Sequence, residues 1–208
     1  MSNLDRFKSE VARLFFSLPA SSQFLLAGGG ALLASGLSTR PTEDLDFFGS
    51  RATRDVATVS RIFELAAARE GWGTKPLRRS EHFVRLKVEG PETIAIDFCT
   101  DTQATLPVVH TSVGPTYSGP ELGGRKMLAL FSRAEARDFV DVFELARVFG
   151  RETLFARAKR LDAGFGRQPF CEAVQRLAIY DDFELPIDQT IVGELRRFFQ
   201  AWTDELSA

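Results

Sequence analysis

The chain has 208 residues, enough for one large domain or two small ones with a buried core. Apolar residues make up 44% of it and charged residues 26%, as in ordinary soluble globular proteins. The net charge of −2 argues against a protein that binds polyanions by bulk electrostatics, although arginines cluster locally at 51–61, 78–85 and 147–167.

The chain shows no sign of secretion or of a membrane span. No basic and then apolar signal segment opens it, and no apolar run reaches the roughly 18 residues that a span needs. Cys99 and Cys171 belong to no Cys-x-x-Cys pattern, and disulfides persist mainly in oxidising compartments. We therefore expect a cytoplasmic protein with two buried, reduced thiols.

The N-terminal segment alternates helical and strand-like patterns. Residues 3–17 carry apolar side chains at helical spacing, and the apolar run at 24–27 predicts a short buried strand. Gly28-Gly29-Gly30 separates that strand from a helix-like run at 31–34. Such glycines let the backbone approach a ligand closely, and free N–H groups at a helix start favour phosphate. Glycine runs also serve simply as turns, so that interpretation stays open.

Asp44 and Asp46 lie two residues apart, where a polar segment containing Pro41 gives way to an apolar run. Because side chains alternate along a strand, both carboxylates are expected on one face. Two like charges that close repel each other unless a divalent cation lies between them, and oxygen ligands suit Mg²⁺ or Mn²⁺ better than zinc. The pattern predicts metal-assisted chemistry on a nucleoside triphosphate. The alternative is a solvated turn with Asp46 as a surface charge.

The remaining pattern separates a mixed half from a helical half. After a helix at 53–70, the runs at 83–88 and 93–98 predict antiparallel strands, with a short strand near 106–110. Further helices are expected at 121–132, 135–149, 151–162, 169–179 and 188–206. We therefore expect an α+β unit over 1–118 and a helical region over 119–208 packed on it.

Two blocks of sequence carry a family resemblance. The first contains Gly28-Gly29, Ala31-Leu32-Leu33, Arg40, Thr42 and Asp44-Leu45-Asp46-Phe47; the second contains Lys126, Arg137-Asp138 and Asp141. In this order they resemble the AbiEii/AbiGii-type nucleotidyltransferase toxins, which include MenT-like toxins and belong to the DNA polymerase β-like superfamily. The resemblance implies an α+β fold: a polymerase β-like nucleotidyltransferase core, a mixed sheet with flanking helices, followed by a C-terminal helical region.

Asp97 is the natural third carboxylate beside Asp44 and Asp46. By strand alternation it points away from the core-facing residues of 93–98. In the resembled superfamily a residue so placed ligates the catalytic metal or activates the attacking hydroxyl. The resemblance thus implies that these three aspartates are catalytic and hold Mg²⁺, or Mn²⁺. Asp101 is a rival for the third position, and an exposed strand aspartate without a role is the alternative.

The resemblance also implies a set of nucleotide-binding residues: Gly28, Gly29, Gly30, Arg40, Thr42, Lys126, Arg137 and Asp138. Lys126 would neutralise triphosphate charge and is implied, with Asp141, to be catalytic. The ordinary role of a lone lysine is on the surface, and Arg40 and Thr42 have a turn-stabilising alternative. Asp138 and Asp141 are expected as neighbours on a helix surface, where they would bind nucleotide, orient Lys126 or fix Arg137. The alternative is a structural ion-pair network that ties the helical half to the catalytic half.

The function implied by the resemblance is that of a toxin in a toxin–antitoxin system. It would transfer NMP from an NTP to an RNA acceptor, with the 3′ end of tRNA as the expected site, and block translation. A cognate antitoxin encoded nearby is the implied partner. We expect RNA backbone contacts at a basic cluster: Arg147, Arg151, Arg157, Lys159, Arg160 and Arg167.

Two other functions stay open on the sequence. Nucleotidyltransferases with the same glycine and Asp-x-Asp arrangement modify small molecules, including antibiotics, or protein hydroxyl groups. A catalytically inactive binding module on the same fold is the third function, and the intact Asp44, Asp46 and Lys126 argue against it.

Overall fold

The computed structural model describes residues 4–50 and 55–207. Position 3 of the first expected helix, positions 53–54 of the second, and the clustered Arg51 and Arg54 lie outside these ranges. The chain divides into two compact units, Met1–Ser118 and Gly119–Ala208, and each is described by itself.

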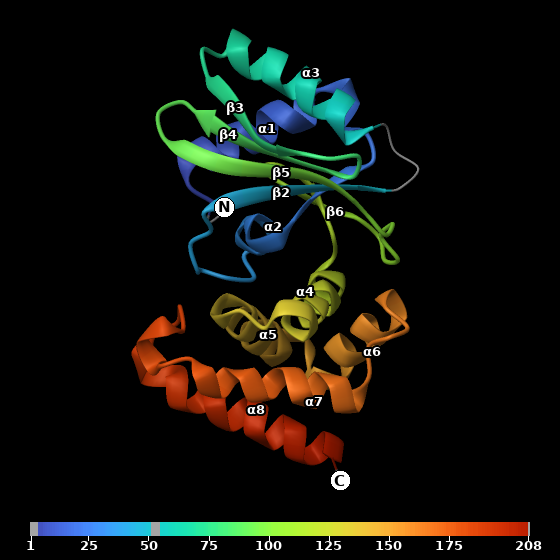
Figure 1. Ribbon diagram of the computed structural model, residues 1–208, viewed down its shortest axis with the longest axis vertical. Helices are drawn as coiled ribbons and strands as arrows, with labels where there is room; N and C mark the ends of the chain where they lie inside the picture. Colours follow the sequence, from blue (N-terminus) through green and yellow to red (C-terminus); the bar gives the residue numbers. More distant parts are fainter. Residues whose placement is uncertain (1–3, 51–54, 208) are drawn as a thin grey trace. The chain divides into compact units, whose positions relative to one another are not determined.

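The first unit is built on one mixed sheet of seven strands (Figure 1). The strands are β1 (Phe24–Ala27), β2 (Asp44–Ser50), β3 (Gly73–Arg79), β4 (Phe83–Glu89), β5 (Thr93–Asp101), β6 (Val109–Thr111) and β7 (Gly114–Thr116). Their order across the sheet is β3-β4-β5-β2-β1-β7-β6. The β2–β5 and β1–β7 pairs are parallel and the other pairs are antiparallel. This order places β2, which carries Asp44 and Asp46, in the middle of the sheet.

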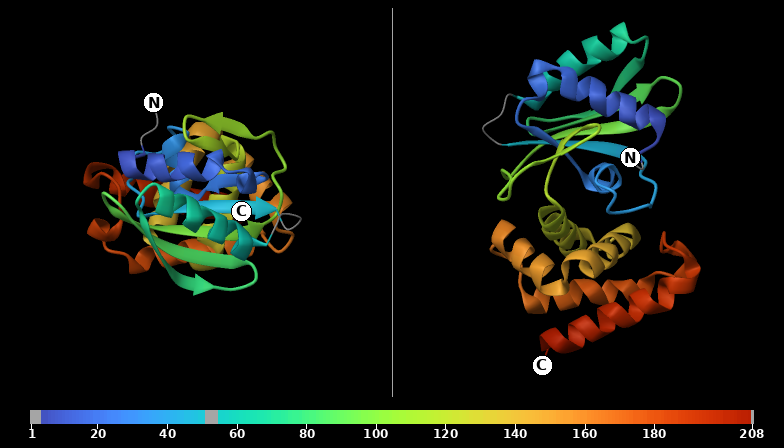
Figure 2. Two further views of the ribbon diagram at one scale, coloured as in Figure 1. Left: turned by 90° about the horizontal axis from the view of Figure 1, so that it is seen from above. Right: turned by 180° about the vertical axis from the view of Figure 1, so that it is seen from behind.

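Helices cover both faces of this sheet (Figures 1 and 2). Two of them, α1 (Arg6–Ser17) and α3 (Val56–Arg69), lie on one face, and the short α2 (Gly28–Ala34) lies on the other. The two longer helices begin at aspartate caps: Asp5 accepts a hydrogen bond from the Lys8 amide, and Asp55 accepts two from the following turn. A short 3₁₀ turn, Pro19–Ser21, links α1 to β1.

A cluster of phenylalanines between the sheet and α1 and α3 forms the core of this unit. Phe15 of α1 stands at its centre, and the rings of Phe24, Phe47, Phe63 and Phe98 each lie within 6.3 Å of it. All five are essentially inaccessible to solvent. Because side chains alternate along each strand, turning Phe47 and Phe98 toward the helices turns their neighbours Asp46 and Asp97 to the opposite face. The hydrophobic core therefore fixes the direction of the carboxylates.

The second unit is entirely helical. Its helices are α4 (Gly119–Arg133), α5 (Ala136–Phe149), α6 (Arg151–Leu161), α7 (Arg167–Gln175) and α8 (Val192–Ser207), with 3₁₀ turns at Arg176–Ile179, Asp182–Glu184 and Gln189–Ile191. Gly124 lets α4 approach α6 closely, since a Cβ there would lie 2.7 Å from the Cβ of Arg157. A second aromatic cluster, which includes Phe170, Phe199 and Trp202, packs between α7 and α8.

The expected fold class is confirmed: a mixed sheet with flanking helices is followed by C-terminal helices. Several details differ from the expectation, among them β7, which lies where no strand was expected. The run Gly28-Gly29-Gly30 forms the first turn of α2 and does not precede it. Strand β3 was not expected, because 73–79 contains Pro76 and three basic residues and lacks apolar alternation. Its pairing with β4 outweighs this low strand propensity.

Candidate active site

Three carboxylates from adjacent strands gather on the sheet face opposite the phenylalanine core. In the parallel β2–β5 ladder Asp46 lies directly opposite Asp97, and Asp44 lies opposite Ala95. Asp44 and Asp46 share a face, as their spacing predicts. One oxygen from each of Asp44, Asp46 and Asp97 lies within 4.8 Å of the others. We call these three residues the acidic triad.

Burial is deepest at Asp97, whose residue surface is 7% exposed. Its pKa is raised to about 6, mainly because burial disfavours the charged form; the guanidinium of Arg85 lowers it and the nearby Asp44 charge raises it. Its Oδ1 atom is buried and accepts no hydrogen bond from the described residues. This oxygen therefore has unused capacity to bind a cation.

Arg85 of β4 is the cationic neighbour of the acidic triad. In the antiparallel β4–β5 ladder it lies directly opposite Asp97, and its Nε is 3.4 Å from Asp97 Oδ1. Its Nη2 donates a hydrogen bond to Asp44 Oδ2 at 3.3 Å. One guanidinium thus spans two members of the triad and offsets part of their repulsion. Our sequence reasoning missed Arg85, because its pairing with Asp97 depends on a register in which residues 90–92 separate the paired Glu89 and Thr93.

The donor set fits a hard divalent cation. All three residues offer carboxylate oxygens, their atoms are close enough to share one ion, and no described residue donates a hydrogen bond to the buried Asp97 Oδ1. Mg²⁺ and Mn²⁺ prefer such oxygen ligands. Asp101, the rival third ligand, lies opposite Ser50 at the far end of the β2–β5 ladder and is outside the triad.

The glycine run brings backbone against the triad. Gly28 has φ +59°, and a Cβ there would stand 1.8 Å from Asp46 Oδ2, so any side chain would displace that carboxylate. A Cβ on Gly29 would lie 2.6 Å from Thr42 Oγ1. Gly30 instead faces Leu45 of the core. Core packing therefore accounts for Gly30, whereas Gly28 borders the Asp46 carboxylate and Gly29 borders Thr42 and Arg40.

Thr42 and Arg40 lie on the loop that leads into β2. Thr42 is buried, and its Oγ1 donates a hydrogen bond to Asp44 Oδ1 at 3.3 Å. Arg40 donates from Nη1 to the carbonyl oxygen of Pro41 at 3.0 Å, and its Nη2 would be 3.5 Å from a Cβ on Gly29. Thr42 thus orients a triad carboxylate, and Arg40 presents a guanidinium next to the glycine run.

The second unit contains the other predicted residues. Lys126 of α4 is 7% exposed, and its Nζ lies 2.6 Å from Oδ2 of Asp141 on α5, which is fully buried. The carboxylate fixes the position of the ammonium group. Asp138 and Asp141 lie three residues apart on α5, and both are completely buried.

Asp138 and Arg137 have partners within the second unit. Both oxygens of Asp138 accept hydrogen bonds from Arg133 at 2.8 Å, and Oδ2 also accepts one from the Glu135 amide in a capping box. Arg137 is partly exposed and donates from Nε to Glu135 Oε2 at 2.8 Å. These ion pairs lie within the second unit, and a network between the two halves of the chain stays an alternative.

The cysteines differ from expectation in their burial, and two residues of the basic cluster have acidic partners. Cys99 and Cys171 are free thiols, but both are partly exposed and not buried. In the cluster within 147–167, Arg147 lies 4.0 Å from Glu194 and Arg151 lies 2.8 Å from Glu205, so two of its six cations pair with α8.

Within 4–50 and 55–207, no helix has the length and apolarity needed to cross a bilayer.

Sequence comparison finds one family whose profile matches nearly the whole chain. Residues 12–204 match the family described as nucleotidyl transferase AbiEii toxin, type IV toxin–antitoxin system. A comparison with curated proteins finds no significant match.

Solved structures show the same fold at low sequence identity. JHP933 from Helicobacter pylori matches with a TM-score of 0.58 and 18% identity, over 98% of this chain and 95% of that chain. A putative nucleotidyltransferase from H. pylori matches at 0.57 and 19%, over 97% and 96%. MenT4, a nucleotidyltransferase toxin from Mycobacterium tuberculosis H37Rv, matches at 0.61 and 18%, over 95% and 82%.

The raised pKa of Asp97 predicts how stability depends on pH in the presence of a chelator. Because the folded state holds this proton up to about pH 6, against 3.8 for the reference value, stability should fall as pH rises from about 4 to 6. The full loss is at most about 3 kcal/mol. Urea denaturation of wild type and Asp97→Asn at pH 4 and pH 7 measures it. Equal pH dependence in the two proteins would contradict the assignment.

Proposed function

Because the chain belongs to the AbiEii nucleotidyltransferase toxin family of type IV toxin–antitoxin systems, we propose that its acceptor is RNA, specifically the 3′ end of tRNA, and that this transfer blocks translation. The observation that supports the chemistry is the acidic triad next to Gly28. Its substrates are an NTP and the RNA, its partner is a cognate antitoxin encoded nearby, and it acts in the cytoplasm.

Asp44, Asp46 and Asp97 would hold Mg²⁺, or Mn²⁺, through the oxygens that converge on one face of the sheet. The bound cation would supply neutralisation of charge on the phosphorus oxygens, which is a large part of catalysis in nucleotidyl transfer. Thr42 keeps Asp44 in its orientation by a hydrogen bond, and Gly28 leaves room for the Asp46 carboxylate.

The transfer forms one bond and breaks one. The acceptor hydroxyl oxygen attacks the α-phosphorus of the NTP, a new P–O bond forms, and the bond from that phosphorus to the bridging oxygen breaks with release of pyrophosphate. Asp97, buried and next to the triad's other carboxylates, accepts the hydroxyl proton. The residues of the chain contribute mainly by position and charge.

The remaining residues would bind and neutralise the triphosphate. Gly28 and Gly29 offer backbone without side chains, with Arg40 next to them. Lys126 carries the charge that opposes the phosphates, and Asp141 fixes its ammonium group. The other predicted nucleotide-binding residues are Gly30, Thr42, Arg137 and Asp138. Of these, Asp138 acts as a positioning residue, because Arg133 already occupies both of its oxygens.

We assign the nucleotidyltransferase core to 1–118 and the helical region that carries Lys126 to 119–208. The core holds every member of the acidic triad. Lys126 of the helical region is 7% exposed, which does not fit the ordinary surface position of a lone lysine. A lysine buried against a carboxylate in this way has a positioned charge, which is what binding a triphosphate requires.

Label transfer tests the proposed activity. Purified protein incubated with Mg²⁺, each labelled NTP in turn and total tRNA should place label on the 3′ end of tRNA. Asp44→Asn should lower the rate at least about 100-fold, since even indirect partners of metal ligands cost 10–100-fold. Asp101→Asn is the matched control and should leave the rate within about twofold, because it lies outside the triad.

The same assay separates the competing acceptors. Parallel reactions contain cell protein or aminoglycosides in place of tRNA. Label in either of these fractions, with none on tRNA, would overturn the RNA assignment and leave a nucleotidyltransferase of another specificity. An unchanged transfer rate in Asp44→Asn would remove the triad from the chemistry.

A double-mutant cycle tests whether Asp141 acts through Lys126. Lys126→Met and Asp141→Asn should each reduce transfer and raise the KM for NTP, and the double variant should be no worse than Lys126→Met alone. The buried pair Glu121–Arg125 on α4 provides the control. Glu121→Gln should lower the free energy of unfolding without changing the KM. Additive losses at Lys126 and Asp141 would contradict the coupling.

A further inference from the structure

Strands β3 and β4 continue the face of the acidic triad with basic residues. The ladders place Arg78, Arg85, Asp97 and Asp46 in one row across β3, β4, β5 and β2, and Lys75, Lys87, Ala95 and Asp44 in a second row. Residues directly opposite each other point to the same face. Each row therefore runs from two cations at the sheet edge to an acidic residue. We call Lys75, Arg78, Arg85 and Lys87 the cationic rows.

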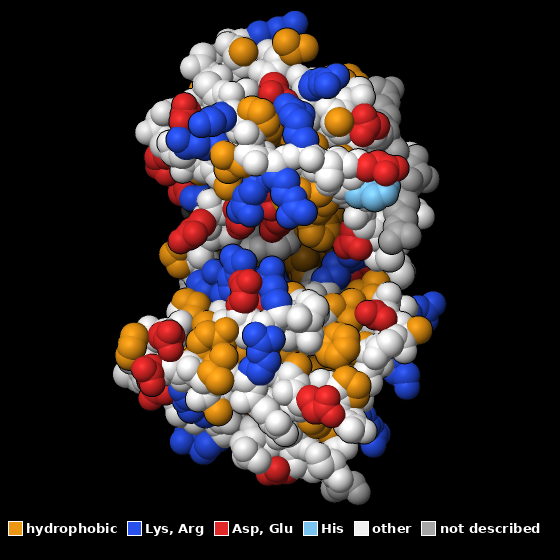
Figure 3. Space-filling model, in the orientation of Figure 1, with side chains coloured by type: hydrophobic (Ala, Val, Ile, Leu, Met, Phe, Trp, Pro, Cys, Tyr) orange, Lys and Arg blue, Asp and Glu red, His pale blue; other side chains and the backbone are white. Residues whose placement is uncertain are grey.

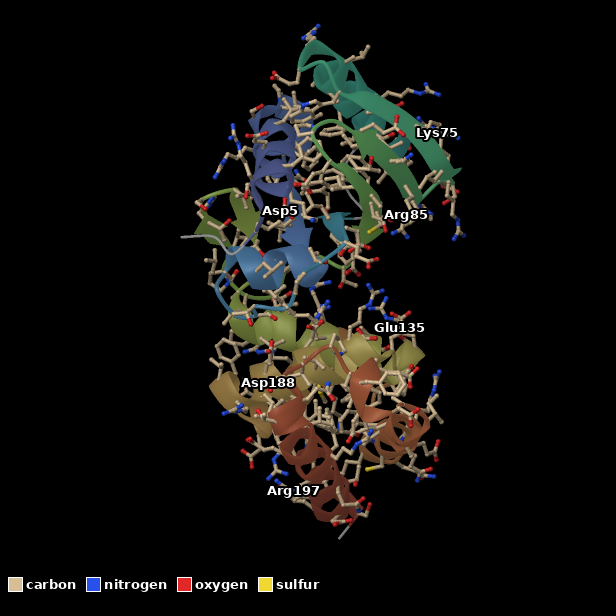
Figure 4. All side chains as sticks on the ribbon, turned by 90° about the vertical axis from the view of Figure 1, so that its left-hand side faces the viewer. Asp5, Lys75, Arg85, Glu135, Asp188 and Arg197 are labelled. Atoms are coloured by element: carbon tan, nitrogen blue, oxygen red, sulfur yellow. The ribbon has the colours of Figure 1, made fainter. Side chains whose placement is uncertain are left out.

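Figures 3 and 4 show this arrangement on the molecule. In Figure 4, Lys75 and Arg85 extend from neighbouring strands on the same side of the first unit. In Figure 3, which has the orientation of Figure 1, Lys and Arg side chains lie over the half of the sheet that contains β3 and β4, next to Asp and Glu side chains. Adjacent strands are about 4.8 Å apart, so Arg78 stands roughly 10 Å from Asp97 along its row.

Two like-charge pairs lie within the cationic rows, and Lys75 and Arg78 are the members farthest from the acidic triad. Lys75 lies opposite Lys87, and Arg78 lies opposite Arg85, so two like-charge pairs face each other across the β3–β4 ladder. Like charges directly opposite destabilise a sheet. Glu89, which pairs with Lys87, is the one acidic residue that β3 and β4 carry. An anion that bridges the two rows would remove this repulsion.

Protection of the sheet edge does not explain the pattern. Edge strands use Lys and Pro to prevent pairing with other chains, and β3 has both in Lys75 and Pro76. That purpose needs charges on β3 only, whereas β4 adds Arg85 and Lys87 on the same face. On the opposite face Arg79 donates to Glu64 of α3 at 2.6 Å, so a basic residue of β3 that faces the helices is paired.

We propose that the cationic rows bind the phosphate backbone of the RNA acceptor and lead its single-stranded 3′ end to the acidic triad. This inference rests on the proposed function, which supplies the RNA. Phe83 lies on the same face of β4, with the guanidinium of Arg78 stacked over its ring at 5.4 Å. A partly exposed ring next to phosphate-binding cations is the arrangement on which an unpaired base stacks.

This location is separate from the RNA surface expected from the sequence, which stays a prediction. Arg147 and Arg151 of the basic cluster in 147–167 already pair with Glu194 and Glu205. The basic cluster was found as charges close together along the chain. The cationic rows come together only through the pairing of β3 with β4, and β3 was not expected as a strand. The net charge of −2 is compatible with this site, because the rows are local.

Binding of fluorescein-labelled, deacylated tRNA without NTP tests the proposal apart from the chemistry. Lys75→Gln/Arg78→Gln should weaken binding roughly 10–30-fold at 0.1 M salt and reduce the slope of log Kd against log salt by about 1.4, the value for two phosphate contacts. Arg61→Gln/Arg69→Gln removes the same charge from exposed positions on α3, across the sheet, and should leave both quantities unchanged. Thermal unfolding of each variant checks the fold.

The outcomes separate this inference from the proposed function. In the transfer assay the Lys75/Arg78 variant should show a raised KM for tRNA and an unchanged KM for NTP. Three results would overturn the cationic rows as an RNA site. The Lys75/Arg78 variant could bind tRNA with wild-type affinity and salt slope, the Arg61/Arg69 control could lose as much affinity, or the wild type could fail to bind tRNA. Failure of label transfer while tRNA binding still depends on Lys75 and Arg78 would overturn the proposed chemistry and leave the site in place.

Discussion

Repulsion among three carboxylates on one sheet face is the constraint around which the first unit is organised. Asp44, Asp46 and Asp97 bring their oxygens within 4.8 Å, and nothing in their own strands holds such charges together. The opposing force comes from the other face of the same strands. Phe47 and Phe98 are buried against α1 and α3, and the transfer of those rings out of water fixes both the register and the direction of the aspartates. The core thereby preorganises the site.

Partial compensation of the charge comes from the neighbours of the triad. Arg85 spans Asp44 and Asp97, and Thr42 donates a hydrogen bond to Asp44. Gly28 contributes by what it lacks, since a side chain there would collide with Asp46. None of these neighbours fills the coordination capacity of the buried Asp97 oxygen. These neighbours therefore offset only part of the repulsion among the carboxylates, and the site still favours binding of a cation.

Local periodicity explains which parts of this account could be predicted from the sequence. Alternation placed Asp44 and Asp46 on one face and turned Asp97 away from the core, because each inference needs only a strand. Arg85 needed a register as well, which links two strands. Strand β3 could not be predicted, because Lys75, Pro76 and Arg78 have low strand propensity and only pairing with β4 makes them a strand. The burial of Asp138 and Asp141 depends on ion pairs that join α4 to α5.

The central claim is that the three carboxylates of the acidic triad together bind one divalent cation. Titration of Mn²⁺ followed by electron paramagnetic resonance, without NTP or RNA, measures this directly. Wild type and Asp101→Asn should each bind one ion with the same affinity, whereas Asp44→Asn and Asp97→Asn should bind it at least about tenfold more weakly. Equal binding by all four proteins, or no binding by wild type, would contradict the central claim.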